Sequence, residues 1–590
     1  MLLYFFRGTS AQSSPINYGA NFPATDALGR RLPGYKEVGG PRKDKYVGIF
    51  YWTWHTGNAY EKKGPNDVTK ILKRKPEAIE NYNDPIWPKG NVPFYWGEPL
   101  FGYYQDTDRW VLRKHAEMLA DAGVDVVIFD CTNGDITWKK TYMKLCRVWS
   151  KARKEGVKTP YIAFMLGLFA QQTSLKAMEK LYQNFYKPGL YKNLWFYWKS
   201  KPLIMAYPEL LKDVPGDIVE ANLRKRIKNF FTFRPGQPAY NKGEEKPNQW
   251  GWLQIYPQHG FIKRKDGNYE QIPVGVAQNW SKERGLTAMN APNAFGRSYT
   301  HAHGQIDTPG AVNHGYNFQE QWNRALEMDP EFIFIDGWNE WIAGRYKVWQ
   351  KQPNAFPDEF SEERSRDIEP MKGGYKDDYY YQMVANIRRF KGVRPEQAAS
   401  DSKTIIIDGK FGDWKDVLPN FEAYKGSTEH RNSAGWGSLH YVNNTGRNDI
   451  ILAKVARDTN NIYFYVQTVK DLTPSSDPGW MRLFINVDRN YKTGWEGYDF
   501  VINLVNPGKK GLLEKSKKGW DWRPVALVDY AVKKNKLEIK VSKKSLGVSD
   551  KPDFEFKWSD NMQNPGHIMD FWVNGDVAPS GRFNYHYFVK

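Results

Sequence analysis

Acidic, amide and aromatic side chains follow several apolar segments of strand length. The most informative is Glu340, which comes after the apolar run 332–336 and lies between Trp338 and Trp341. Burial against aromatic rings raises the pKa of a carboxyl group and suits it to proton transfer near neutral pH. The alternative is a structural role, with Glu340 paired to a cation such as Arg345.

Hydrolysis of a glycosidic bond needs a second carboxyl group, because one acts as acid and the other as base or nucleophile. Asp130 ends the most apolar strand candidate, 124–130, and is our first choice. Its alternative role is to cap or orient the loop that follows. Glu209 is the second choice, whereas Asp336 lies inside a strand end and is expected to be structural.

Rings and amides accompany these acids near the same predicted strand ends. Aromatic faces stack on sugar rings, and amides bind hydroxyl groups, so the set indicates a carbohydrate site. The predicted substrate contacts are Trp52, Trp54, His55, Asn133, Gln278, Trp280, His301, His303, Trp338, Asn339 and Trp341. Core packing is the alternative for each tryptophan. No acidic triad lies near the two histidines His301 and His303 in sequence, so we expect no metal and no cofactor for catalysis.

Strands and helices alternate over residues 45–395 and must position these side chains. The strand candidates are 46–52, 124–130, 161–166, 202–207, 229–233, 251–256, 273–278 and 332–336. This alternation predicts an α/β fold, and eight units predict a (β/α)8 TIM-like barrel with its active site at the carboxyl ends of the strands. An open doubly wound sheet is the alternative, but the turn after the first strand lacks the glycines of that fold.

Helical periodicity nearly vanishes after residue 396. The expected domains are a barrel over 14–396, a linker over 397–404 and a β-sandwich over 405–590. Short strand candidates bounded by turn residues, among them 405–408 and 570–573, predict the sandwich.

Residues 1–13 combine a short apolar patch with small residues and resemble the end of a secretory signal. We therefore expect a secreted, periplasmic or cell-surface protein of a bacterium. No apolar run reaches the length of about 18 residues that predicts a transmembrane segment. Cys131 and Cys146 are the only cysteines, which excludes a disulfide framework.

The formal net charge of +19 over 590 residues favours anionic partners. Lys and Arg are spread along the chain, and neither a basic arm nor a nucleic-acid motif occurs, so we expect no nucleic-acid partner. Aromatic residues make up 16%, which either sugar stacking or a large core would explain. The expected partner is a poly- or oligosaccharide, and an acidic glycan is one alternative.

Several motifs in the first domain resemble the glycoside hydrolase family 99-like proteins, which include endo-α-mannosidases, and the related family 71 α-glucanases. The matching parts are residues 103–130, the segment 338–341, and the ending with 368–370 and 377–381. The resemblance covers about residues 45–393. It implies a barrel glycosidase in which Glu340 is the base or nucleophile.

The endo-mannosidase motif has a second catalytic glutamate where this chain has Ala343. Three functions therefore stay open. The chain is a hydrolase whose acid comes from elsewhere, a glycan-binding protein that has lost its acid, or a polysaccharide-assembly enzyme. Export disfavours the third.

The second domain resembles the family 9-like carbohydrate-binding sandwiches in residues 407–414, 484–488 and 497–500. Such a domain either binds glycan through exposed rings, here Trp436 or Trp522, or braces the barrel. The resemblance also implies a structural cation, with Asp488 and Asp499 as candidate ligands.

Overall fold

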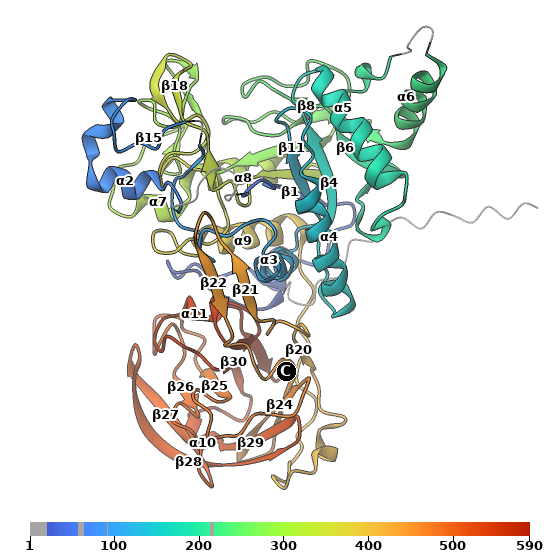
Figure 1. Ribbon diagram of the computed structural model, residues 1–590. Helices are drawn as coiled ribbons and strands as arrows, with labels where there is room; N and C mark the ends of the chain where they lie inside the picture. The colour runs from blue at the N-terminus through green and yellow to red at the C-terminus, as the bar shows by residue number, and fades with distance from the viewer. Residues whose placement is uncertain (1–20, 57–63, 91, 213–216) are drawn as a thin grey trace, which may run out of the picture.

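The computed structural model describes residues 21–56, 64–90, 92–212 and 217–590. An N-terminal α/β domain lies above an all-antiparallel β domain (Figure 1), which confirms the predicted fold class. The predicted signal remnant 1–13 lies outside the described residues. Within the described ranges, no helix is both long and apolar enough to cross a membrane.

A curled parallel sheet forms the centre of the N-terminal domain. Its strands are β1 (Tyr46–Tyr51), β3 (Val126–Cys131), β4 (Tyr161–Leu166), β6 (Lys201–Met205), β7 (Thr232–Phe233), β11 (Tyr269–Gly275) and β16 (Phe332–Asp336). The order is β11-β16-β1-β3-β4-β6-β7, and every neighbouring pair is parallel. The short strand β8 (Gly236–Gln237) follows β7 and pairs with β9 (Trp250–Gly251), also in parallel.

A side-chain amide joins β9 to β11. Gln271 accepts the N–H of Gly251 and donates to its carbonyl, both at 2.9 Å, as a neighbouring strand would. All eight predicted strand positions are therefore occupied around the curl. The predicted strand 251–256 is shorter than expected, because Ile255 donates its N–H to the Tyr240 carbonyl instead of to a strand.

Helices cover the outside of the sheet (Figure 1). They include α3 (Arg109–Ala122), α4 (Lys139–Lys154), α5 (Gln172–Leu181), α8 (Tyr316–Met328) and α9 (Asp378–Lys391), and α6 (Ile218–Phe230) lies further out. Helix α3 begins where Asp108 accepts the N–H groups of Trp110 and Val111, and it ends at Gly123 with φ 82°. Because β3 is covered on both faces, it is buried throughout, and its residues up to Phe129 are apolar without alternation.

The inner face of β16 leads directly to the candidate site. Phe332 packs against Trp250 inside the curl, and Phe334 packs against Phe50. Side chains alternate along a strand, so Asp336 lies on the same inward face, at the carboxyl end of β16.

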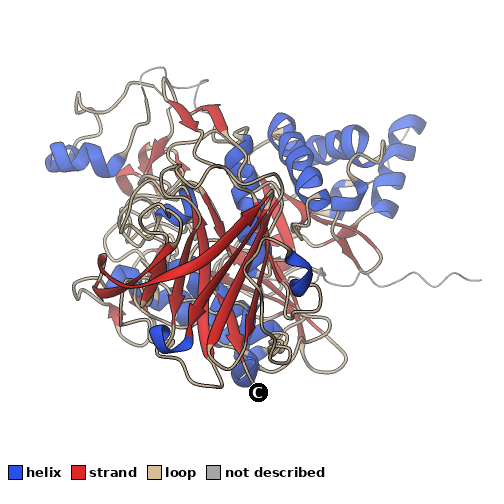
Figure 2. Ribbon diagram, turned by 90° about the horizontal axis from the view of Figure 1, so that it is seen from below, coloured by secondary structure: helices blue, strands red, loops and turns tan. Residues whose placement is uncertain are grey.

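The C-terminal domain is one long antiparallel sheet that folds over itself (Figure 2). Its strands are β20 (Phe421–Glu422), β23 (Ile450–Arg457), β24 (Asn461–Thr468), β25 (Arg482–Asn486), β26 (Phe500–Ile502), β27 (Gly511–Lys518), β28 (Asp521–Lys533), β29 (Lys536–Ser542), β30 (Asp553–Asp560), β31 (Asp576–Ala578) and β32 (Tyr585–Phe588). Strand β28 pairs with β27 through its first part and with β29 through its last, so it belongs to both layers. Phe464 of one layer contacts Phe554 and Phe556 of the other.

Two strands predicted in this domain are wrong. Residues 405–408 have no regular structure, and residues 570–573 form the short helix α11 (Asp570–Val573). The apolar rings of α11 serve the contact with the first domain, since Trp572 packs on Tyr380 and donates its indole N–H to Asp377 at 3.0 Å.

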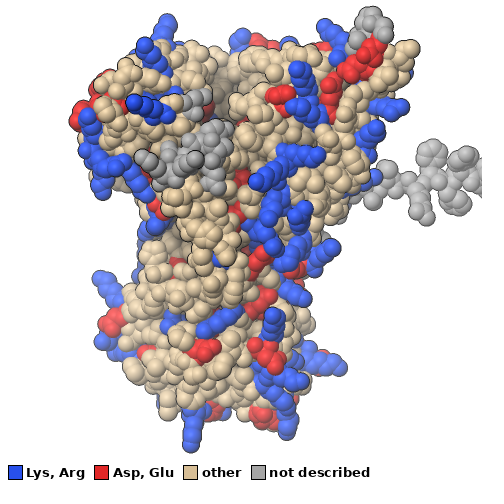
Figure 3. Space-filling model, viewed as in Figure 1, with Lys and Arg blue, Asp and Glu red and all other residues tan. Residues whose placement is uncertain are grey.

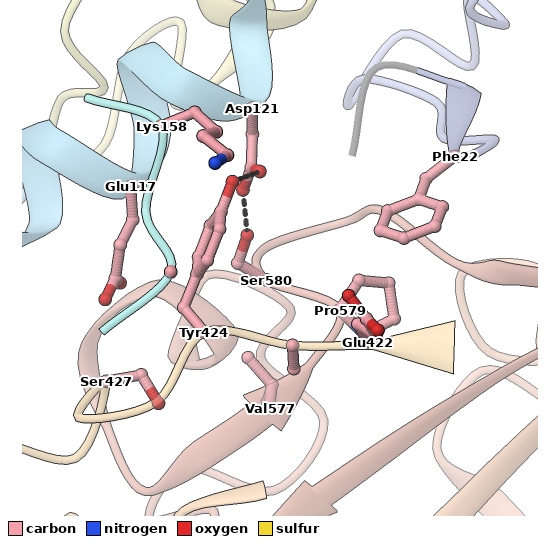
Figure 4. Close-up of a pocket in the computed structure, with 12 residues that line it drawn as sticks. Phe22, Glu117, Asp121, Lys158, Glu422, Tyr424, Ser427, Val577, Pro579 and Ser580 are labelled. Atoms are coloured by element: carbon pink, nitrogen blue, oxygen red, sulfur yellow. Dashed lines mark hydrogen bonds between the residues drawn. The ribbon is translucent and has the colours of Figure 1, made fainter. Parts of the chain in front are cut away.

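Buried polar contacts hold the two domains together. Arg431 lies in the hairpin of β21 (Arg431–Ala434) and β22 (His440–Asn443), and it pairs with Asp108 at 2.8 Å. Asp121 of α3 accepts hydrogen bonds from Ser580 (2.6 Å) and Tyr424 (2.7 Å) beside an interdomain cavity of about 280 Å³ (Figure 4). The domains therefore meet through specific contacts over a broad surface.

The predicted linker and one of the rings predicted to bind glycan also contact other parts of this molecule. In the segment 397–404, Ala399 and Ser400 donate N–H groups to carbonyls of the second domain. Trp436, predicted to be exposed, is buried against Tyr95 at the interface, so it packs instead of facing solvent. Trp522 is half-buried.

Candidate active site

A buried arginine surrounded by carboxylates lies at the carboxyl end of β16. The Nη2 atom of Arg366 is 2.8 Å from Oε2 of Glu340 and 3.5 Å from Oδ1 of Asp358. Its Nε atom is 3.6 Å from Asp336 and 3.7 Å from Glu359. We call these five residues the acid cluster. Glu340 therefore pairs with Arg366, and not with the Arg345 that its sequence position suggested.

The acid cluster contains more acids than cations. Burial raises the pKa of Glu340 well above its ordinary value; Asp358 and Asp336 add to this, and Arg366 opposes it. Burial likewise raises the pKa of Glu359 well above its ordinary value. One guanidinium cannot neutralise four carboxylates, so the cluster retains protons near neutral pH.

Asp336 is the best placed to carry such a proton. It is fully buried, and neither carboxylate oxygen has a hydrogen-bond partner in the described part of the chain. Burial raises its pKa to about 7, with Arg366 opposing and Asp358 and Asp130 adding. An ionised carboxylate without hydrogen bonds is costly in such a place, which favours the neutral acid.

Asp130 lies at the end of β3, two strand positions from Asp336. One oxygen accepts the N–H (2.9 Å) and hydroxyl (2.7 Å) of Thr132, and the other accepts the indole N–H of Trp54 at 3.3 Å. Burial raises its pKa. Asp130 thus caps the following turn, the alternative role expected from sequence, while its charge still acts on Asp336.

Three tryptophan rings stack beside Asp130. The centroids of Trp52 and Trp54 are 4.7 Å apart, and those of Trp54 and Trp138 are 5.9 Å apart with an interplanar angle of 12°. Asn339 accepts the N–H of Trp52 at 2.9 Å and so fixes the end of β1. We call the three rings the tryptophan stack. Its third member, Trp138, was not predicted.

A cavity of about 740 Å³ adjoins the tryptophan stack. His55 and Trp138 contribute to its lining. Nδ1 of His55 is held by Asp106 at 2.8 Å, whereas Nε2 is buried without a hydrogen-bond partner in the described part of the molecule. The cavity can therefore offer a sugar the aromatic ring of Trp138, while the imidazole of His55 stays buried in its wall.

Two predicted contact residues instead pack behind the barrel. Trp338 is fully buried against His115 and Tyr380. Trp341 stacks on Trp96 with centroids 4.8 Å apart, and it donates its indole N–H to Glu369. Their positions fit core packing, the alternative that the sequence left open for each tryptophan.

The segment after β11 contributes one residue near the acid cluster. Gln278 exchanges both amide hydrogen bonds with Asn317, at 2.9 and 3.1 Å, and is committed to that pair. Trp280 is half-buried, with its ring 6.3 Å from that of Tyr240. Asn279, between Gln278 and Trp280, accepts a hydrogen bond from Nη1 of Arg366 at 3.4 Å and is the residue of this segment that reaches the acid cluster.

The other predicted residues are on the surface. Asn133 is exposed, and Glu209 pairs with Lys246 at 3.2 Å. His301 and His303 are exposed in the turn between β14 (Tyr299–Thr300) and β15 (Gly304–Gln305). None of the four contacts the acid cluster in the described part of the molecule.

No group of three or more His, Cys, Asp and Glu residues among those described is placed to hold a metal ion. In the C-terminal domain, Asp499 is buried and Asp488 is exposed. Burial raises the pKa of Asp499, a hydrogen bond from the Val487 N–H opposes this rise, and the charge of Asp488 adds to it. The structural cation stays a prediction.

Comparison with known proteins gives a structural likeness alone. No family model and no curated protein matches the chain. Two structures of a GH99 endo-alpha-mannosidase from Bacteroides thetaiotaomicron are 13% and 14% identical, with TM-scores of 0.31 and 0.32; each alignment covers 59% of this chain and 97% or 98% of the other. A family 5 glycoside hydrolase structure from Bacteroides vulgatus is 11% identical over 76% of this chain and 90% of the other, with a TM-score of 0.24. With scores this low, we take nothing about activity from these structures.

Proposed function

We propose that the protein is a glycoside hydrolase whose reaction takes place at the acid cluster. The observation that carries the proposal is that Asp336 and Glu340 contact the same guanidinium, at 3.6 and 2.8 Å, and that burial raises the pKa of both carboxyl groups. Contact with one guanidinium keeps the two carboxyl groups close together, and the catalytic pair of glycosidases is separated by roughly 5–10 Å.

The two carboxyl groups have different roles. Glu340 accepts a charge-assisted hydrogen bond from Arg366, which opposes the rise that burial causes in its pKa and orients the carboxyl group as the base or nucleophile. Asp336 has no donor to stabilise a negative charge and keeps its proton up to a pKa of about 7, which suits the acid. Asp130 is the second choice for the acid, because its pKa is also raised but both its oxygens are engaged.

The tryptophan stack supports a sugar as the substrate. Flat apolar rings beside carboxyl groups bind the faces of pyranose rings and leave the hydroxyl groups for amides and imidazoles. Trp54 connects the two features, because its ring stacks on Trp138 and its indole N–H reaches Asp130.

A panel of poly- and oligosaccharides tests the proposal through released reducing sugar. Wild type should release sugar from at least one member, and Glu340→Gln should release at least about a thousandfold less. Glu327→Gln, an exposed change of the same chemistry, is the matched control and should act as wild type. Equal release by wild type and Glu340→Gln would remove Glu340 from the mechanism.

A glycan-binding protein without catalysis is the second candidate. Ala343 is buried on β17 (Ile342–Ala343), which pairs with β2 (Phe94–Tyr95), and it offers no acid at the place where the resembling family has a glutamate. In that case the panel would show binding but no release by any variant.

A further inference from the structure

Helix α4 carries a row of basic side chains on one face. The row consists of Lys140, Lys144, Arg147, Lys151 and Lys154, with Lys139 at the first position of the helix. Spacings of four and three residues keep such side chains on the same side of a helix. Figure 3 shows Lys and Arg gathered in a band over this part of the surface. We call the row the basic face of α4.

This basic face has few acidic partners inside the molecule. Among the described residues, Lys151 alone of the row forms ion pairs, with Glu155 at 3.0 Å and Glu429 at 3.5 Å. Burial lowers the pKa of Lys144, and the neighbouring charges of Arg109 and Arg147 lower it further. Like charges held together with few counter-charges make a surface complementary to an extended anion.

The amino-terminal end of α4 meets the cavity beside the tryptophan stack. Lys139 and Lys140 line that cavity together with Trp138 and His55. Trp138 in turn stacks on Trp54, which reaches Asp130. The basic face is therefore connected through the tryptophan rings to Asp130, whose charge acts on Asp336 of the acid cluster.

We propose that the substrate is an anionic polysaccharide, which lies along the basic face of α4 and reaches the acid cluster past the tryptophan stack. This inference rests on the proposed function and specifies its substrate class. The acid cluster would repel a charged substituent, so the sugar at the cleaved bond presents hydroxyl groups there. The carboxylate or sulfate groups of the chain lie over Lys139 and Lys140, and a sugar ring contacts Trp138 in the cavity.

Affinity electrophoresis with four probes tests the surface: polygalacturonate, dextran sulfate, neutral dextran and an oligothymidylate. The protein carries Glu340→Gln so that no chain is cut. The variant K140Q/R147Q removes two charges from the basic face, and the control K225Q/K228Q removes two exposed charges from α6. Thermal unfolding checks that both variants are folded.

We expect the parent protein to bind an acidic polysaccharide. The affinity of K140Q/R147Q for it should be lower by roughly fivefold or more, and it should depend less on salt, because fewer counterions are released on binding. The control K225Q/K228Q should bind the acidic polysaccharide as tightly as the parent protein does. The affinity for neutral dextran should be the same for the parent protein and for K140Q/R147Q. Equal weakening by both pairs of substitutions would reduce the effect to net charge and overturn the inference. Tighter binding of the oligothymidylate would identify a nucleic-acid surface and also overturn it.

The two proposals fail in different ways. Sugar release from neutral glycans, without binding of either acidic probe, would overturn the inference and leave the hydrolase in place. If an acidic probe binds through the basic face but wild type releases no sugar, the proposed binding surface would be supported and the proposed hydrolase activity would be overturned.

Discussion

Two buried arginines of this molecule differ in how well their carboxylate partners are satisfied by hydrogen bonds and ion pairs. At the domain interface, Arg582 pairs with Asp377 at 2.9 Å and with Glu496 at 2.9 Å, and Trp572 donates a further bond to Asp377. In the barrel, Arg366 faces the four carboxylates of the acid cluster, one of which has no hydrogen bond to either oxygen.

The comparison separates a structural pair from a reactive one. A buried ion pair whose donors and acceptors are matched is fully satisfied and has no capacity to exchange protons. A cluster with excess carboxylate holds protons that it can give up, which is what general acid catalysis requires.

The largest expected effect comes from removing the proton donor. Asp336→Asn should lower kcat/KM on the glycan found by the panel by about 100- to 10,000-fold, because the leaving group loses its acid. Asp377→Asn is the matched control and should keep kcat/KM while lowering the melting temperature. An equal loss of kcat/KM in Asp336→Asn and Asp377→Asn would mean that the carboxylates around Arg366 have no catalytic role that distinguishes them from those around Arg582.

Arg582→Met tests the structural member of the pair. It leaves Asp377 buried without its guanidinium and should lower the free energy of unfolding by about 3–5 kcal/mol in urea titrations. Activity of the folded fraction at low temperature should match wild type. Unchanged stability would show that the interface does not depend on this ion pair.

The pH dependence of stability tests the protonation of Asp336. Its folded pKa of about 7 lies above the ordinary value, so the folded state keeps a proton that the unfolded chain releases. This contribution is complete below about pH 4 and is lost as pH rises through 7; it amounts to a few kcal/mol at most. The free energy of unfolding of Asp336→Asn should therefore decline less between pH 4 and 8 than that of wild type. Parallel declines would contradict the assigned protonation.

The smallest effect concerns the tryptophan stack. Trp138→Ala should raise KM by about 5- to 10-fold with little change in kcat, because a stacked ring contributes on the order of 1 kcal/mol to binding. Trp522→Ala, in the second domain, should leave KM unchanged on a short oligosaccharide. A drop in kcat alone for Trp138→Ala would move this ring from binding to catalysis.

The sequence was sufficient to place the strands that build the site. Six of the eight predicted segments coincide with strands of the curled sheet, because runs of apolar residues buried on both faces have few other uses. In the other two, residues 229–230 end helix α6 and only residue 251 of 251–256 lies in a strand. The strand predicted over α11 is wrong, because the apolar residues Phe571 and Trp572 of this segment are buried at the domain interface and not in a sheet.

The acid cluster was only half predictable. Glu340 follows its strand directly, and Asp336 could have been found from the two-residue period that continues Phe332 and Phe334. Arg366 belongs to a loop without periodicity, 26 residues after Glu340, and only the folded chain brings the two together. The acid-rich stretch around it was the sole local signal.

The division of labour between Glu340 and Asp336 is tested most directly with an aryl glycoside of the released sugar. A phenolate with a low pKa leaves without protonation, so Asp336→Asn should keep bond cleavage close to that of wild type, while Glu340→Gln should lose it. Measured rates of nitrophenol release that fall equally in both variants would contradict the assignment of Asp336 as the acid.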